Sequence, residues 1–330
     1  MHKPSRSARR LGVALALVAG LGLMAAPQRA KAWEPEKPVE LIVMAAAGGG
    51  ADQIARLFQS IIEKRELSPV PFVVVNKPGG SGAEALRYLS ENAGNEHVLL
   101  ITLNSIFTTP LLDPGLGVDV TDYTPVARMA MDTFLLWVNA DSGIESLDGY
   151  IKAVRAKGTA WKMGGTGSGQ EDSLVTAMLE AELDVKVTYI PFAGGGTVAR
   201  NLSVGHVDST VNNPSEQMGY FEAGQARPLM AMTPERLPQF PDVPTSAELG
   251  HPGLVYFMQR SVVAPSGISS AVRDWYIGLF RKVNGSEEWA AFTESDSLFR
   301  DWLAGDDLAA YFENEVEKHR RLLKTAGELQ

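Results

Sequence analysis

Short apolar runs alternate with amphipathic segments along most of this 330-residue chain. Residues 39–44 form a nearly continuous apolar run, which is typical of a strand buried on both faces of a parallel sheet. From Ile54 to Ile62, apolar residues recur at about every third or fourth position, which predicts a helix with one apolar face. The same two patterns follow each other in segments 72–90, 134–157, 162–179 and 186–204. Strands that alternate with helices predict parallel pairing and an α/β fold.

Beyond residue 228 the pattern becomes irregular, with five prolines between Pro228 and Pro244. Residues 256–264 then predict another strand, and residues 269–283 and 306–326 predict two closing helices. The last helix is charged on most of its faces, so we expect it in an outer layer of the fold.

Four times, a predicted strand runs through a loop of small residues into a helix. These loops lie at residues 46–50, 78–82, 164–169 and 194–196. Because the carboxyl ends of parallel strands meet at one edge of a sheet, the loops should share a crevice there. Free amides and helix dipoles favour an anion in such a place, and glycine lets the backbone approach it closely. The loops therefore predict a small anion held mainly by backbone amides; the alternative for each loop is an ordinary turn.

The first 32 residues have the three-part pattern of a secretory signal peptide. Basic residues come first, then an uncharged apolar run from Leu11 to Ala26, then Ala30-Lys31-Ala32 with small residues at the two cleavage positions. We expect cleavage before Trp33 and export to the periplasm; the alternative is an uncleaved N-terminal anchor, for which the run is short.

Charge and composition exclude several classes of protein. Without residues 1–32 the chain has 24 basic and 39 acidic side chains, a net charge of −15, which disfavours nucleic acid as a partner. The chain has no cysteine, which excludes zinc–thiolate sites, iron–sulfur clusters and thiol catalysis. It contains neither the G-x-x-x-x-G-K-[ST] phosphate loop nor a dinucleotide fingerprint, so we expect no cofactor.

Signals for catalysis and for metal binding are weak. The sequence around Ser81, Gly79-Gly80-Ser81-Gly82-Ala83, resembles a nucleophile elbow whose last glycine is replaced by alanine. Four histidines could serve as its base, but each is better explained as a surface or structural residue: His97, His206, His251 and, on the exposed-looking last helix, His319. No histidine spacing indicates a metal site. We therefore predict no catalytic residue, no metal and no enzyme activity.

Motifs along nearly the whole chain after residue 32 resemble those of one family. They lie at residues 37–56, 73–84, 124–128, 189–196, 205–208, 223–229, 241–245 and 264–267, and include Asn76-Lys77-Pro78-Gly79 and Tyr189-Ile190-Pro191-Phe192. In order and spacing they resemble the periplasmic solute receptors of tripartite tricarboxylate transporters, called Bug receptors in one large lineage.

The resemblance implies a two-lobed, type II periplasmic binding-protein fold with a mixed, mostly parallel sheet in each lobe and a two-crossover hinge. The first lobe would comprise residues 33–131 and 257–330, and the second lobe residues 132–256. The family implies a small organic acid of the di- or tricarboxylate type, captured between the lobes and delivered to inner-membrane permease subunits. We expect a monomer.

The resemblance also implies which residues bind the ligand. The first loop, the glycine loop of the second lobe and two strand ends would supply Ala46, Ala47, Gly48, Gly49, Asp52, Asn104, Ser105, Thr166, Gly167, Ser168 and Asn212. Asn212 has an equally good alternative role in a turn before Pro214. The first loop departs from the family because it lacks the usual prolines. The second-lobe loop departs because Glu171 and Asp172 follow Ser168 closely, and two carboxylates there would oppose a bare polyanion.

Two other functions remain open at this point. An exported hydrolase that uses Ser81 as its nucleophile is the enzyme alternative. A sensor-input protein whose closed lobes dock on a membrane kinase is the other, and it would use the same ligand-binding residues as a transport receptor.

Overall fold

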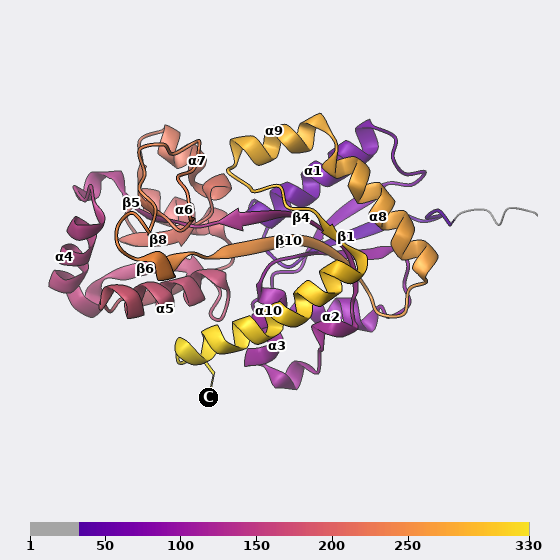
Figure 1. Ribbon diagram of the computed structural model, residues 1–330, viewed down its shortest axis with the longest axis horizontal. Coiled ribbons are helices and arrows are strands. Elements are labelled where there is room, and N and C mark those ends of the chain that lie inside the picture. Colours follow the sequence, from indigo (N-terminus) through magenta and orange to yellow (C-terminus); the bar gives the residue numbers. More distant parts are fainter. Residues whose placement is uncertain (1–32, 330) are drawn as a thin grey trace, which may run out of the picture. The chain divides into compact units, whose positions relative to one another are not determined.

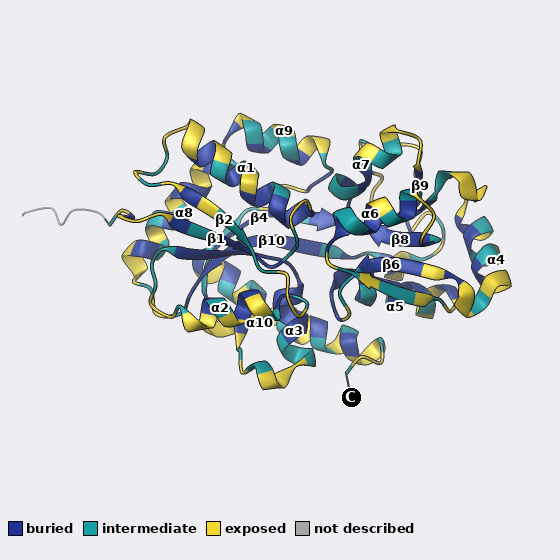
Figure 2. Ribbon diagram, turned by 180° about the vertical axis from the view of Figure 1, so that it is seen from behind, coloured by how far each residue is buried: buried dark blue, intermediate teal, exposed yellow. Residues whose placement is uncertain are grey.

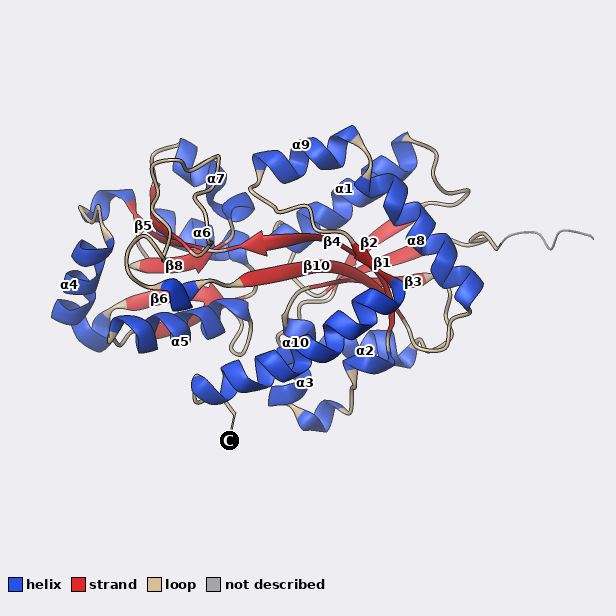
Figure 3. Ribbon diagram, in the orientation of Figure 1, coloured by secondary structure: helices blue, strands red, loops and turns tan. Residues whose placement is uncertain are grey.

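The fold is built on two separate mixed sheets (Figure 3). The computed structural model describes residues 33–329, so the predicted signal peptide at 1–32 lies outside the described residues. The first sheet contains β1 (Val39–Val43), β2 (Phe72–Asn76), β3 (Val98–Thr102), β4 (Thr124–Thr133), β10 (Phe257–Ala264) and β11 (Leu303–Ala304). Its strand order is β11-β4-β10-β3-β1-β2, with β1 parallel to β2 and β3 and with β10 antiparallel to β3 and β4.

The second sheet has the same mixed character. It contains β5 (Leu135–Asn139), β6 (Lys162–Thr166), β7 (Thr188–Phe192), β8 (Ser209–Asn212) and β9 (Ala226–Ala231), in the order β7-β6-β8-β5-β9. Strand β6 is parallel to β7 and β8, whereas β5 is antiparallel to β8 and β9. The predicted α/β fold with a mixed sheet in each of two lobes is therefore confirmed. The expectation that each sheet is mostly parallel is wrong, because three of the five strand pairings in the first sheet and two of the four in the second are antiparallel.

Ten α-helices cover the two sheets in the described part of the chain. They are α1 (Gly50–Lys64), α2 (Ala83–Glu91), α3 (Ser105–Leu112), α4 (Leu147–Lys157), α5 (Glu171–Leu183), α6 (Gly195–Ser203), α7 (Pro214–Glu222), α8 (Ser270–Asn284), α9 (Glu287–Ser295) and α10 (Gly305–Thr325). Helices α1, α8 and α9 cover one face of the first sheet, and α2, α3 and α10 cover the other (Figure 1). Short 3-10 turns occur at Pro114–Leu116, Val120–Asp122, Ala140–Ser142, Gly158–Ala160 and Pro252–Leu254.

Two long neighbouring strands connect the lobes. Strand β4 leads directly into β5 of the second sheet, and the chain returns through residues 232–256 into β10 (Figure 1). Strands β4 and β10 pair antiparallel with each other over their length, with Met258 opposite Asp132. They form the predicted two-crossover hinge. The expected lobe boundaries at 131/132 and 256/257 stay a prediction.

Continuous apolar strands account for the core of the first lobe. All five residues of β3 are buried, as expected for a strand that is covered on both faces. Strand β10 is likewise buried along nearly its whole length (Figure 2). Helix α10 is charged on its outer side, but it buries Leu308, Phe312 and Leu323 and packs against β4 and α3. Of the two roles expected for His319, surface or structural, the structure shows the structural one, because this side chain is fully buried and its Nε2 lies 3.1 Å from the Tyr256 hydroxyl.

The sequence pattern missed six elements, namely α3, β4, α7, β9, α9 and β11. Strand β4 carries the charged residues Arg128 and Asp132, strand β9 contains Pro228, and the short helix α9 follows α8 after a two-residue break. Gly164 and Gly165 belong to β6 and not to the loop after it. A side chain at Gly165 would overlap the ring of Tyr189 on the neighbouring strand β7. Within residues 33–329, no helix is both long enough and apolar enough to cross a membrane.

The hinge contains a buried ion pair. Arg260 of β10 donates from Nε to an Asp132 carboxylate oxygen of β4 at 3.0 Å, and both side chains are at most 2% exposed. Removing one partner of a buried pair leaves the other charge without compensation, which is far more costly than breaking a surface pair.

Replacing Arg260 with methionine should therefore lower the free energy of unfolding by about 3–5 kcal/mol, measured by urea denaturation. The control is Arg236→Met, which breaks the half-exposed pair with Glu248 and should cost less than about 1 kcal/mol. Equal losses in the two variants would contradict a special role for the hinge pair.

Candidate functional site

A small cavity lies between the lobes, where the carboxyl ends of strands from both sheets meet. Its volume is about 30 Å³, and it is lined by Ala45, Gly49, Gly50, Ala51, Leu103, Thr166, Gln170, Glu171, Asp172, Ala193, Gly194, Gly195, Asn213, Glu216, Met258 and Arg260. These residues include the first turns of α1, α5, α6 and α7. A volume of that size holds about two water molecules, so the lobes are closed on each other.

A carboxylate of the second lobe occupies the N-terminus of α1 in the first lobe. Glu216 of α7 accepts a hydrogen bond from the Gly50 amide at 2.8 Å. Its other oxygen, Oε2, faces Gly195 at the start of α6, where a Cβ would overlap it. Glu216 therefore lies between the first turns of two helices, where the dipoles favour a negative charge.

A second carboxylate crosses the cleft in the same way. Glu171 of α5 accepts a hydrogen bond from the amide of Ser105, the first residue of α3 in the first lobe. Its neighbour Asp172 accepts from the Thr166 amide at 2.8 Å within the second lobe. Both side chains are at most 4% exposed. Two helix N-termini of the first lobe are thus capped by acids of the second.

The pKa values of these acids are raised. Burial raises the pKa of Glu216 to about 7, although the Gly50 amide and Arg260 act in the opposite direction. Burial, together with the charges of Glu216 and Glu171, raises the pKa of Asp172 well above its usual range. Burial also raises the pKa of Glu171, against the effect of its amide hydrogen bonds and of Arg260. Closely packed acids in a low-dielectric site hold protons more tightly for these reasons.

Arg260 is the one cationic side chain that lines this cavity, and its charge is already paired. It forms the buried ion pair with Asp132 and donates to the Asn213 side-chain oxygen at 3.3 Å. Glu171, Asp172 and Glu216 have no ion-pair partner among the described residues. The lining therefore carries an excess of carboxylates over cations.

Several residues that the sequence predicts as ligand contacts meet around the cavity. Gly49 and Thr166 both line it. Ala46 lies against Gly194, and the carbonyl oxygen of Gly48 lies so close to Gly196 that a Cβ there would be 2.9 Å from it. The first loop and the second-lobe glycine loops thus come together as expected, while the ligand-binding role of each residue stays a prediction.

Other predicted residues make hydrogen bonds inside the protein. Asp52 accepts from the Gly48 amide, from Arg56 and from Asn76, and Asn104 donates to Tyr256 and to the Phe257 carbonyl. Asn212 donates to the Gly195 carbonyl. None of these three side chains lines the cavity. Their contacts hold the loops in shape, and a direct contact with ligand also stays a prediction for each.

Ser81 links the lobes at the rim of the cleft. Its hydroxyl donates to the Ser168 carbonyl at 2.9 Å, next to Gly167. No histidine of the described residues forms a hydrogen bond with Ser81. The hydroxyl that the hydrolase alternative needs therefore serves a contact between lobes. Ala47 and Ser105 do not line the cavity, although the Ser105 amide contacts Glu171.

Of the residues that line the cavity, sequence reasoning predicted only Gly49 and Thr166 as ligand contacts. Among the polar residues that it missed, Glu216 lies in a helix that the pattern did not predict, and Arg260 lies inside a strand. Gln170 directly precedes α5. The one available signal was the pair Glu171 and Asp172, whose position beside the loop already argued against a bare polyanion.

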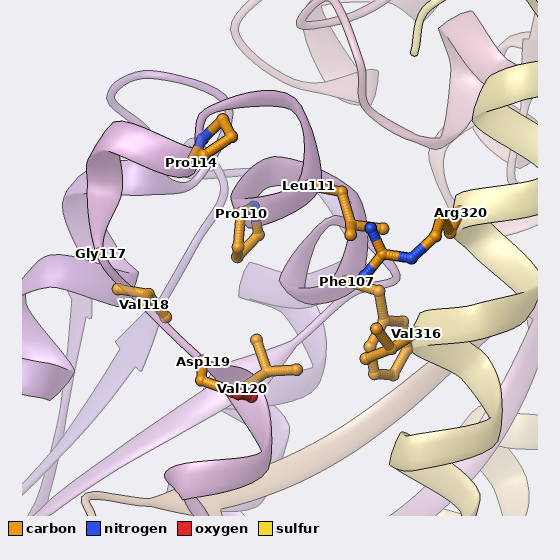
Figure 4. Close-up of a pocket in the computed structure, with 10 residues that line it drawn as sticks. All are labelled: Phe107, Pro110, Leu111, Pro114, Gly117, Val118, Asp119, Val120, Val316 and Arg320. Carbon is orange, nitrogen blue, oxygen red and sulfur yellow. The ribbon is translucent and has the colours of Figure 1, made fainter. Parts of the chain in front are cut away.

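A larger cavity lies on the outside of the first lobe (Figure 4). Its volume is about 430 Å³, and it lies between α3, the turns that follow α3, and α10. Its lining is mostly apolar, with Asp119 and Arg320 as the charged residues. It contains none of the predicted ligand contacts. The candidate site is therefore the cleft cavity.

The fold and cleft agree with a known family of proteins. The model of the tripartite tricarboxylate transporter family receptor matches residues 54–327. The chain belongs to this family. Among its relatives is protein BugT of Bordetella pertussis, strain Tohama I, which is 27% identical over 293 residues and 87% of each chain.

Solved structures of similar proteins have the same fold. The periplasmic binding protein BugD superposes with a TM-score of 0.84 at 21% identity, covering 89% of this chain and 98% of that one. A Rhodopseudomonas palustris protein solved with adipate superposes with a TM-score of 0.83 at 27% identity, over the same shares of the two chains. The chain is therefore a receptor of the periplasmic solute-binding type, and the two-lobed fold expected from the resemblance is confirmed.

The raised pKa of Glu216 makes the stability of the fold depend on pH. Between the usual pKa of 4.5 and the folded value of about 7, the folded chain holds a proton that the unfolded chain has lost. The free energy of unfolding should therefore rise as pH falls from about 7 to about 4.5, by roughly 1–3 kcal/mol from this group. Urea unfolding at a series of pH values measures the slope.

The variant Glu216→Gln isolates this effect. Its free energy of unfolding should depend less on pH between about pH 4.5 and about pH 7 than that of the wild type. Glu222→Gln removes an exposed acid from the same helix and should leave the slope as it is in the wild type. A Glu216→Gln chain with an unchanged slope would show that Glu216 takes up no proton on folding.

Proposed function

We propose that this chain is the extracytoplasmic receptor of a tripartite tricarboxylate transporter. It captures a small organic acid between its two lobes and delivers it to the permease subunits in the inner membrane. The observation that carries the proposal is the cavity in which helix N-termini from both lobes converge on one point between the two sheets. The family match and the adipate-bound relative support an organic acid as the solute.

Lobe closure is the proposed means of capture. A solute of four or more carbons does not fit the closed cavity of about 30 Å³, so the lobes must separate to admit it. The hinge strands β4 and β10 supply the two connections about which the lobes can move. Only a solute that contacts both lobes favours the closed form over the open one.

Backbone amides can supply enough affinity for this role. Micromolar binding needs about 8 kcal/mol. A charge-assisted hydrogen bond contributes roughly 1.5–3 kcal/mol and a helix N-terminus roughly 0.3–2 kcal/mol. Three or four such contacts reach that affinity after the costs of association, without a dedicated arginine.

The test of this proposal starts with the protein purified under native conditions. Mass spectrometry of the solute released on denaturation identifies what the receptor carries. The same compound should raise the melting temperature of the solute-free protein by linkage. Cells that lack the chain should lose uptake of that compound. Uptake that continues at the wild-type rate would contradict the transport role.

The close approach of Gly196 to Gly48 gives a variant that opposes closure without touching the cavity lining. Gly196→Ala places a Cβ 2.9 Å from the Gly48 carbonyl oxygen in the closed form. Affinity for the carried solute, measured by calorimetry, should fall at least about tenfold, while the stability of the solute-free protein stays equal or rises slightly because alanine favours helix.

The matched control is Gly219→Ala on α7, where an added Cβ meets nothing within 4 Å. It makes the same change within a helix and should bind the solute as the wild type does. Equal affinities in all three proteins would argue against closure through this contact.

A further inference from the structure

The first lobe's two anion-binding helix ends in this cleft are already occupied by the protein itself. Glu216 accepts a hydrogen bond from the backbone amide at the start of α1, and Glu171 accepts one from the backbone amide at the start of α3. A carboxylate ligand that used these amides would have to displace both side chains. The closed cleft therefore presents carboxylates to a solute more than it presents free amides.

The three acids of the lining lack charge compensation. Glu171 and Asp172 are at most 4% exposed, yet neither forms an ion pair with another described residue, and the same holds for Glu216. The nearest cation, Arg260, is held by Asp132 and Asn213. A buried acid without a paired cation ordinarily takes up a proton, which agrees with the raised pKa values of these three acids. A cation bound beside them would instead hold them in their ionised form.

A polar side chain next to these acids also has no partner. Gln170 is 7% exposed and lines the same cavity, and its backbone N–H donates to the Gly167 carbonyl, but its side-chain amide forms no hydrogen bond with any described residue. Oxygen Oε2 of Glu216 likewise accepts none. Glu216 is only partly buried, whereas a side-chain amide on a residue as buried as Gln170 ordinarily has a partner. Gln170 therefore points to a ligand with hydrogen-bonding groups of its own.

A metal ion is a poor candidate for the missing cation. No group of three or more acidic or histidine side chains within residues 33–329 is arranged to hold one. A nitrogen cation suits the lining better, because an ammonium group donates up to three hydrogen bonds to oxygens that are spread around it.

We propose that the solute of this receptor presents a positively charged nitrogen to the carboxylates of Glu171, Asp172 and Glu216. The inference rests on the proposed receptor function and names the chemical class of its solute. A zwitterionic organic acid and a simple amine share this chemistry, and the experiment separates them. In either case, the solute carries a positively charged nitrogen at the end where a dicarboxylate would carry its second carboxylate.

The test compares compounds of equal length that differ in their end groups. Succinate, 4-aminobutanoate and 1,4-diaminobutane form one series, and adipate, 6-aminohexanoate and 1,6-diaminohexane form another. Calorimetry with the solute-free chain should show that an amine-bearing member binds at least tenfold more tightly than the dicarboxylate of its series. Preference for the amino acid indicates a zwitterion, and preference for the diamine indicates a simple cation.

Variants connect this preference to the named side chains. Glu171→Gln, Asp172→Asn and Glu216→Gln keep the shape of each side chain, and each should weaken amine binding at least tenfold. Glu222→Gln removes one exposed negative charge from the same helix as Glu216 and should change binding less than twofold. Melting of the solute-free variants shows that each is folded. Full retention of amine binding in all three cleft variants would overturn the proposal.

The pH dependence gives an independent readout. The charged groups around Glu216 are Asp132 on β4, Glu171 and Asp172 on α5, and Arg260 on β10. Because the pKa of Glu216 is about 7, amine binding should strengthen from pH 6 to pH 8. Binding that weakens over this range would count against the proposal.

The remaining outcomes separate this inference from the receptor function. Tighter binding of succinate or adipate than of either amine, binding of calcium alone, or a nitrogen-free acid carried through purification would overturn the inference and leave the receptor function standing. A nitrogen-containing solute carried through purification would support it. A chain that carries no solute and binds no member of either series would overturn both proposals.

Discussion

The closed cleft depends on carboxylates of one lobe that bind backbone amides of the other. Glu216 reaches the start of α1, and Glu171 reaches the start of α3. These contacts make the anion-binding property of helix N-termini part of the protein's own structure. They also explain why the cavity is small, since the side chains fill the space where the loops converge. Their raised pKa values follow from the same crowding of acids in a buried place.

The hinge and the cleft are physically connected through Arg260. This residue lies on β10, forms a buried pair with Asp132 of β4, and lines the cavity between the lobes. Its charge lowers the pKa values of Glu171 and Glu216, although burial outweighs that effect. A rearrangement of the hinge strands would therefore change the electrostatic surroundings of the cleft acids. Binding and closure can be coupled through one guanidinium group, because it contacts the hinge directly and lies beside the site.

Family membership and site chemistry answer different questions about this receptor. The family model identifies a receptor of the solute-binding type, and the solved relatives show its two-lobed fold. They leave the solute to be decided by the side chains of this cleft. Here the acids outnumber the cations, whereas a dicarboxylate would call for the reverse. A shared fold can thus serve a different ligand chemistry through a few side chains at the ends of its helices.

The sequence by itself determined the alternating strands and helices, the glycine loops at the strand ends and the family. Strand β1 and helix α1 fall where the apolar pattern predicted them, because that pattern is local. The pairing of Glu216 with Gly50 and of Arg260 with Asp132 spans more than a hundred positions along the chain. No local pattern encodes such contacts. Strands β4 and β10 carry charged residues, so their sequences do not indicate that they are buried. Only the tertiary structure decided which acids enter the cleft, because burial and opposing charge arise when the two lobes come together.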